Sequence, residues 1–119
     1  MSVLEIVGTY YDAWKAGDGD FSAVPLASDF AFTGPVASFE TAEGYCQMAA
    51  QAGPMVTSFT VRRQFVDGDT VCSIIDWAMG LPIASMTSAE ILTVRDGQIV
   101  RGELIYDAQE LRAAIAAGA

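Results

Sequence analysis

The second half of the chain alternates apolar and polar residues over long stretches, and two Asp-Gly pairs interrupt this alternation. Asp67-Gly68 and Asp96-Gly97 are dipeptides that two-residue hairpin turns favour. Around them we expect four strands, at residues 55–65, 70–79, 84–95 and 98–106. Gly80-Leu81-Pro82 predicts a looser turn between the second and third of these strands. Four strands joined in this way form an antiparallel meander.

The first half of the chain has a helical period instead. Ser2 and Glu5 form a capping box, and apolar residues then recur every three or four positions until Gly17. Further elements are expected as helices at residues 21–28, 42–51 (capped by Thr41) and 108–117 (capped by Asp107 and Glu110), with a short strand at residues 30–33. Because helices and strands occupy separate parts of the chain, the fold class is α+β rather than α/β.

The length of 119 residues is enough for one domain with its own core, covering residues 1–119. The apolar fraction of 52% is more than a small soluble monomer hides easily, which indicates an internal cavity, a dimer interface or both. No apolar run approaches the roughly 20 residues of a membrane span. The first residues have neither the basic start nor the cleavage site of a signal peptide, so we expect a cytoplasmic protein.

Charge and residue usage exclude several function classes. The net charge of −9 would repel nucleic acid. Cys46 and Cys72 lie far apart without motif spacing and are expected to be reduced thiols. The chain has no histidine, which excludes a Ser-His-Asp triad and leaves no Cys/His cluster for zinc. We expect no cofactor and no metal, and acid–base chemistry must come from carboxylates, tyrosines or lysine.

The predicted strands are apolar on both faces. Ile74 and Ile75 point to opposite sides, and Trp77 lies on the same side as Ile75. One face can cover a pocket and the helices. The other face needs a second cover, and we expect a homodimer formed through this outer face of the sheet.

Three segments resemble one known group of proteins: YYDAWKAGD at residues 10–18, LASDFAFTGP at 26–35 and AEILTVRDGQIVRGELIYD at 89–107. The chain resembles the nuclear-transport-factor-2-like superfamily, in particular its polyketide-cyclase-like (SnoaL-like), ketosteroid-isomerase-like and limonene-epoxide-hydrolase-like members. This resemblance implies a cone-shaped α+β barrel of the cystatin-like kind, with helices packed on a curved antiparallel sheet around an apolar pocket. It does not imply one activity, because the superfamily includes enzymes, binding modules and association domains.

The active site of ketosteroid isomerases is matched at two of its three positions. The resemblance places Tyr10 at the tyrosine of the first helix that donates to the oxyanion. It places Glu90 at the protonated acid of a late strand. At the position of the general base stands Gly34, which cannot accept a proton.

The limonene epoxide hydrolase pattern is matched less well. Asp76 falls at the aspartate of the Arg-x-Asp pair, but Ile74 replaces the arginine. Leu104 stands at the position of the second aspartate. The resemblance therefore transfers neither activity whole.

Asp76 is unusual in its own right, because a carboxylate in an apolar strand costs several kcal/mol unless it is paired or neutralised. A tight connection that pairs residue 78 with residue 88 would place Asp76 opposite Glu90, where the two carboxyls would share a proton. Glu103 would also face Glu90 after a plain Asp-Gly turn, whereas a bulge would turn it outward and direct Leu104 and Tyr106 into the pocket. Arg63 could instead neutralise Asp76.

We therefore expect an enzyme that isomerises, cyclises or hydrates a small apolar, cyclic molecule. The expected catalytic residues are Asp76, Glu90 and Tyr10. Asp76 would act as acid or base, Glu90 as its partner and Tyr10 as a hydrogen-bond donor. The expected substrate-binding residues are Trp14, Phe32, Tyr45, Met48, Leu92, Leu104 and Tyr106. The alternative is a non-catalytic ligand-binding or dimerisation domain.

Overall fold

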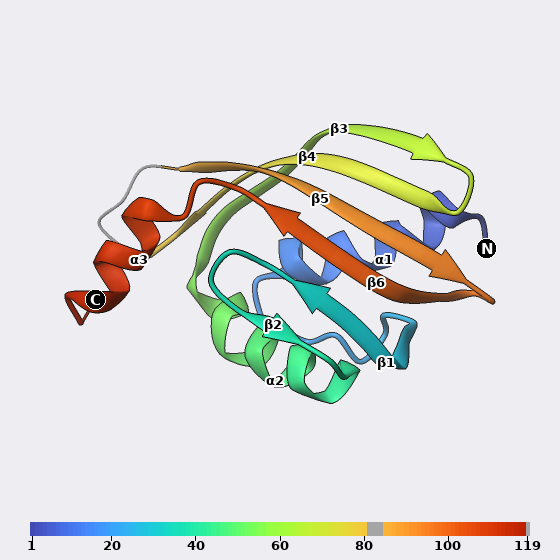
Figure 1. Cartoon of the computed structure of the whole chain (residues 1–119), viewed down its shortest axis with the longest axis horizontal. Helices are drawn as coiled ribbons and strands as arrows, with labels where there is room; N and C mark the ends of the chain where they lie inside the picture. The colour runs from blue at the N-terminus through green and yellow to red at the C-terminus, as the bar shows by residue number, and fades with distance from the viewer. Residues whose placement is uncertain (81–84, 119) are drawn as a thin grey trace.

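A computed structural model of the chain describes residues 1–80 and 85–118 (Figure 1). Its elements are α1 (Val3–Ala16), β1 (Leu26–Thr33), β2 (Ser38–Phe39), α2 (Ala42–Ala52), a 3-10 turn (Gly53–Met55), β3 (Val56–Asp67), β4 (Thr70–Met79), β5 (Met86–Arg95), β6 (Gln98–Ile105) and α3 (Gln109–Ala116). The strands form one sheet in the order β2-β1-β6-β5-β4-β3. The predicted α+β class is confirmed. The turn expected at residues 80–82 lies almost wholly outside the described residues.

The predicted helix caps are largely confirmed. At α1 the Glu5 backbone N–H donates to Ser2 Oγ at 3.1 Å, and the Ser2 backbone N–H donates to Glu5 Oε1 at 2.9 Å. Thr41 caps α2 through a hydrogen bond from the Gly44 backbone. Helix α3 begins at Gln109, one residue later than expected, with Asp107 Oδ1 accepting the Gln109 backbone N–H. These local bonds satisfy donors that a helix start leaves free.

The hairpin between β5 and β6 contains both a tight Asp-Gly turn and a bulge, the two features considered in the sequence analysis. Asp96 and Gly97 have φ values of 53° and 76°, as a tight two-residue turn requires. A register shift then follows, because Thr93 pairs with Arg101 while Val94 pairs with Ile99. The extra residue is a bulge, and it reverses which side chains of β6 face inward.

The helix expected at residues 21–28 is wrong. Residues 22–24 form a turn, and β1 begins at Leu26 and continues to Thr33. Pro25 has no backbone N–H, and its carbonyl accepts a hydrogen bond from the Ile99 backbone at 2.8 Å. This bond fixes the segment against β6, where β1 pairs in parallel. The other strand pairs are antiparallel, so the sheet is mixed.

One face of the curved sheet carries the core. Figure 1 shows the long strands arching over α1, with α2 beside β1 and α3 at one end of the molecule. Fully buried side chains from helices and strands meet on this face, among them Tyr10, Tyr45, Phe30, Leu92 and Ile99. Within residues 1–80 and 85–118, no helix is long and apolar enough to cross a membrane.

Candidate active site

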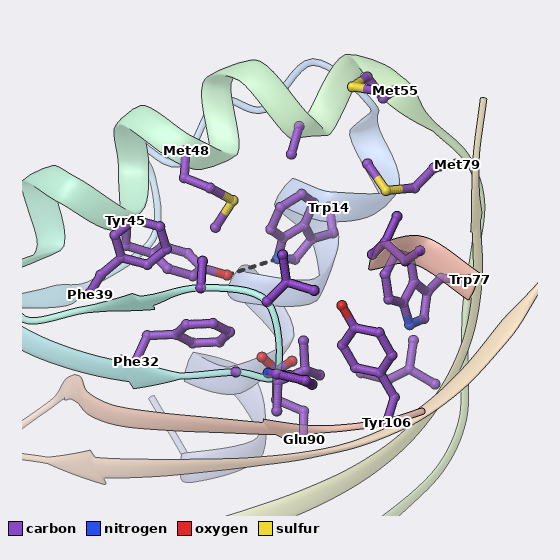
Figure 2. Close-up of a pocket in the computed structure, with 18 of the residues that line it drawn as sticks. Trp14, Phe32, Phe39, Tyr45, Met48, Met55, Trp77, Met79, Glu90 and Tyr106 are labelled. Carbon is purple, nitrogen blue, oxygen red and sulfur yellow. Dashed lines mark hydrogen bonds between the residues drawn. The ribbon is translucent and has the colours of Figure 1, made fainter. Parts of the chain in front are cut away.

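A cavity of about 310 Å³ lies between the inner face of the sheet and the three helices. Its wall is mostly apolar and strongly aromatic (Figure 2). The lining residues come from every helix and from strands β1 to β6: Trp14, Phe32, Gly34, Pro35, Val36, Ala37, Phe39, Tyr45, Met48, Ala52, Met55, Phe59, Ile75, Trp77, Met79, Glu90, Leu104, Tyr106, Leu111 and Ile115. The expected apolar pocket is present, with a size suited to a small organic molecule.

Among the described residues that line this wall, Glu90 is the charged one, and the inward-facing positions of β5 place it there. Its side chain is only 4% exposed and points into the cavity in Figure 2. Burial disfavours the charged carboxylate and raises the pKa of Glu90 to about 7, while the hydroxyls of Tyr10 and Tyr11 act in the opposite direction. Near neutral pH the group therefore exists in both protonated and ionised forms, as a general acid or base requires.

A chain of hydrogen bonds holds the carboxyl in place. The Tyr10 hydroxyl donates to Glu90 Oε2 at 2.9 Å and also bonds the Tyr45 hydroxyl. Trp14 Nε1 donates to the Tyr45 hydroxyl at 3.2 Å. Because Tyr10 has one proton and directs it at the carboxylate, Tyr45 must donate to Tyr10. The chain therefore runs from Trp14 through both tyrosines toward Glu90.

The tyrosines of this chain stay neutral. Burial raises the pKa of Tyr10 and of Tyr45 well above the usual range, and the nearby Glu90 raises both further. Tyr10 is fully buried behind the wall, whereas Tyr45 lines the cavity. The Tyr10 hydroxyl donates to Glu90, and of the two tyrosines Tyr45 is the one that lines the cavity.

Tyr11 is a neighbour of this site that the sequence did not single out. Its hydroxyl is buried and has no hydrogen-bond partner within the described part of the chain. Burial raises the pKa of Tyr11, with Glu90 as the next cause. Tyr11 directly follows Tyr10 on a helix that packs on the sheet. This adjacency is the feature of the sequence that could have identified Tyr11 as a neighbour of the site.

The expected pairing of Asp76 with Glu90 is wrong. In the β4–β5 ladder Asp76 pairs with Thr87, and Glu90 pairs with Ser73. The offset from the expected register is three residues, and an odd offset places the two carboxyls on opposite faces of the sheet. Asp76 therefore lies on the outer face, away from the cavity.

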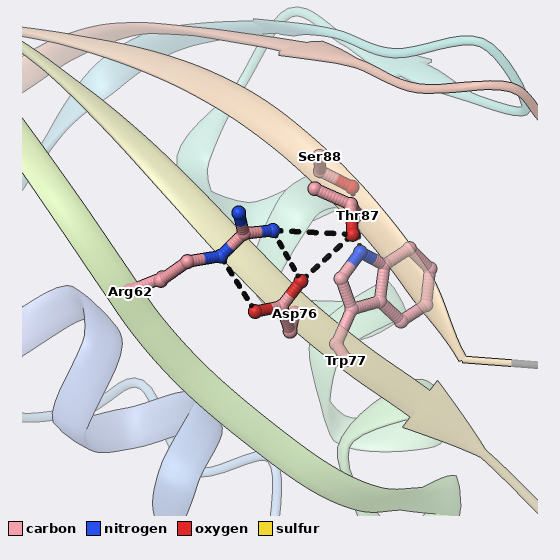
Figure 3. Close-up of polar contacts among 5 residues, drawn as sticks. All are labelled: Arg62, Asp76, Trp77, Thr87 and Ser88. Carbon is pink, nitrogen blue, oxygen red and sulfur yellow. Dashed lines mark hydrogen bonds and ion pairs between the residues drawn. The ribbon is translucent and has the colours of Figure 1, made fainter.

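The neighbours of Asp76 explain why a carboxylate is tolerated there (Figure 3). Arg62 donates from Nε and Nη2 to the two carboxylate oxygens at 2.9 and 2.8 Å, and Thr87 donates to Oδ1 at 2.7 Å. These hydrogen bonds lower the pKa of Asp76. The partner is Arg62, an extra residue at a bulge of β3, and the expected Arg63 lies over the ring of Phe65 instead. The pair is exposed and lies on the face of the sheet away from the cavity.

Most of the expected substrate-binding residues line the cavity: Trp14, Phe32, Tyr45, Met48, Leu104 and Tyr106. Leu92 does not line the cavity, because its side chain is fully buried and packs over Gly102 together with the rings of Phe30 and Phe32. Other lining residues were not among the expected substrate-binding residues, including Phe39, Met55, Trp77 and Met79.

Two further expectations about the site can be compared with the structure. Glu103 pairs with Ile91 on the outer face and is exposed, so the bulged alternative is confirmed and Leu104 faces inward. Gly34 lies in the cavity wall, at the place where the resemblance puts a general base. Among the described residues, no three His, Cys, Asp or Glu side chains gather as they would around a metal ion.

Solved structures share this architecture along nearly the whole chain. An NTF2-like protein of unknown function from Cytophaga hutchinsonii has 20% sequence identity and a TM-score of 0.82, covering 94% of this chain and 96% of its own. A protein from Catenulispora acidiphila with a ketosteroid isomerase-like fold, solved with trimethylamine, has 19% identity and a TM-score of 0.76 over 92% and 91% of the two chains.

An epoxide hydrolase of M. tuberculosis similar to limonene epoxide hydrolases has 15% identity and a TM-score of 0.74, over 98% of this chain and 90% of that one. At these identities the likeness shows the fold. No curated protein gives a significant match to the sequence. The family model of the SnoaL-like domain matches residues 7–102, which is most of the chain, and the protein therefore belongs to the SnoaL-like family.

Proposed function

We propose that this protein is an enzyme that binds a small, mostly apolar, cyclic molecule and uses Glu90 to move a proton on it. The observation that carries this proposal is the buried carboxyl of Glu90 in the aromatic cavity. With its pKa raised to about 7 by burial, Glu90 can both accept and return a proton at neutral pH. No cofactor is needed for such a step.

Isomerisation is the reaction that one such group can complete. The carboxylate removes a proton from a carbon next to a carbonyl, and the electron pair of that C–H bond moves toward the carbonyl oxygen. The same carboxyl then returns the proton to a second carbon as the double bond shifts. Tyr10, Tyr45 and Trp14 act as positioning residues, because their hydrogen bonds fix one oxygen of Glu90.

Relatives support a small-molecule role of this kind. One structural neighbour is described as an epoxide hydrolase, and another was solved with trimethylamine. Cyclisation and hydration are the other reactions for which the fold gives precedent, and both can use a carboxyl as acid or base.

Turnover of matched probes tests the proposal. Wild-type protein is incubated with a cyclic β,γ-unsaturated ketone and with a cyclic epoxide, and products are followed by mass spectrometry. We expect turnover of at least one probe, and Glu90→Gln should lower kcat by about 10²-fold or more. Asp76→Asn is the matched control, since this carboxylate lies on the outer face of the same sheet. Equal loss in both variants would contradict the assignment of Glu90.

A non-catalytic binding domain is the second candidate, and Gly34 favours it. This glycine lies in the cavity wall. It stands at the position where the resemblance to ketosteroid isomerases places the general base, and it cannot accept a proton. Under this alternative the probes bind, as detected by the fluorescence of Trp14 and Trp77 in the wall, and no product forms.

We also propose that the outer face of the sheet carries a second copy of the chain. Phe65 and Ile105 are each more than half exposed on this face. Charges of both signs surround them, including Arg63 and Glu103, so the face can complement itself in a two-fold dimer.

Size-exclusion chromatography with light scattering measures this association. We expect a wild-type dimer, and Ile105→Arg should shift it to monomer because a cation replaces apolar contact area. Leu4→Arg changes a comparably exposed residue on α1 and should leave the dimer intact. A monomeric wild type, or a dimer that both variants retain, would contradict the proposed interface.

A further inference from the structure

Three of the hydrogen-bond donors near Glu90, those of Trp14, Tyr10 and Tyr45, are already committed. Trp14 Nε1 is used by Tyr45, and the Tyr10 proton is directed at Glu90 Oε2. Tyr45 in turn uses its proton on Tyr10. When Glu90 is ionised, this end of the cavity therefore offers a ligand a negative acceptor, and none of these three residues has a free donor.

The charge of the cavity has one sign. Glu90 is the only charged side chain among the described residues that line it, and neither lysine nor arginine is present there. The whole chain carries a net charge of −9. An anionic ligand would lose its hydration without gaining a counter-charge, whereas a cation would gain one.

The aromatic wall of the cavity is suited to enclose such a cation. Trp14 and Trp77, the two tryptophans of the chain, both line the cavity, and Figure 2 shows them with Tyr45 and Tyr106 around one space. The faces of aromatic rings attract ammonium groups, and tryptophan does so most strongly. Methionines complete the wall near the tryptophans with polarisable sulfur atoms.

We propose that the ligand of this cavity is an apolar molecule that carries a protonated or quaternary amine, with the ammonium group paired to Glu90 and enclosed by aromatic rings. The inference rests on the proposed function, in that both need the cavity to hold a small molecule.

Affinity for the amine should depend on pH through Glu90. The polar groups that face its carboxyl are the hydroxyls of Tyr10 and Tyr11 from α1 and of Ser73 from β4. The hydroxyl of Tyr45 from α2 is connected to the carboxyl by its hydrogen bond with Tyr10. The tyrosines stay neutral because burial raises their pKa values. Glu90, with its pKa raised to about 7 by burial, is then the group that titrates, and its ionised form binds the cation.

Two probes that differ in one atom test the inference. Phenyltrimethylammonium and tert-butylbenzene have the same shape, with a positive nitrogen in the first where the second has carbon. Both are titrated into the protein while the tryptophan fluorescence is recorded. At about pH 8 we expect the ammonium to bind wild type about tenfold tighter or more, with that preference falling several-fold by about pH 6. Glu90→Gln should remove the preference and leave tert-butylbenzene binding unchanged.

The outcomes separate this inference from the function it rests on. Equal binding of the two probes to wild type, or tighter binding of tert-butylbenzene, overturns the amine assignment and leaves a small-molecule cavity in place. A preference for the ammonium that survives in Glu90→Gln overturns the pairing with this carboxyl. If neither probe binds, both the amine assignment and the small-molecule function are contradicted.

Discussion

Replacing Glu90 with Gln is expected to make the protein more stable at alkaline pH than the wild type. Burial raises the pKa of Glu90 from 4.5 to about 7, so the folded protein holds this proton more tightly than the unfolded chain does. Between these values the folded state binds more protons, and the free energy of unfolding therefore falls as the pH rises. The full loss is about 3 kcal/mol and is complete above about pH 7. That is a large part of the stability of a domain this size.

The measurement is urea unfolding of wild type and Glu90→Gln from about pH 4 to pH 8. The difference in the free energy of unfolding between the two proteins isolates the contribution of Glu90, since the other carboxyls are common to both. It should be nearly constant below about pH 4.5, change through the window and level off above about pH 7. Glu103→Gln removes an exposed carboxyl of the neighbouring strand and serves as control. A flat difference across this range would mean that Glu90 is not held in an apolar site.

Gly19→Ala is expected to destabilise the fold by roughly 2–5 kcal/mol, the sum of backbone strain and overpacking. Gly19 has a φ of 70°, which side chains with a Cβ rarely adopt. A Cβ at this position would also lie 2.2 Å from the carbonyl oxygen of Ala49 in α2. The contact is with backbone, so α2 would have to move, and with it the Tyr45 and Met48 parts of the cavity wall.

Gly68→Ala separates the two causes. Gly68 has a similar φ of 61° in the β3–β4 turn, but a Cβ there would meet nothing within 4 Å. We expect Gly68→Ala to show the backbone strain alone and Gly19→Ala to show a clearly lower urea midpoint. Equal midpoints for the two variants would contradict the close approach of the loop to α2. Tryptophan fluorescence of Gly19→Ala should also change, because Trp14 donates a hydrogen bond to Tyr45 on the displaced helix α2.

Much of the fold could be predicted because its signals are local. The capping box of α1 and the turn at Asp96-Gly97 depend on residues within a few positions of one another. The alternation of β4 placed Ile75 and Trp77 on the same side, and both line the cavity. The segment at residues 21–28 failed because its strand exists only through pairing with β6, which lies far along the chain.

The sequence by itself therefore determined the order of most elements, the apolar character of one sheet face and the candidates Glu90 and Tyr10. The tertiary structure decided which carboxyl enters the cavity. The register of β4 against β5 differs from the expected pairing by three residues, and this offset moves Asp76 to the outer face. It also decided that Tyr45 and Trp14 join Tyr10 in one chain of hydrogen bonds, since two helices separated in sequence meet only when packed on the sheet. Burial at that meeting point is what changes Glu90 from an ordinary acid into a group that titrates near neutral pH.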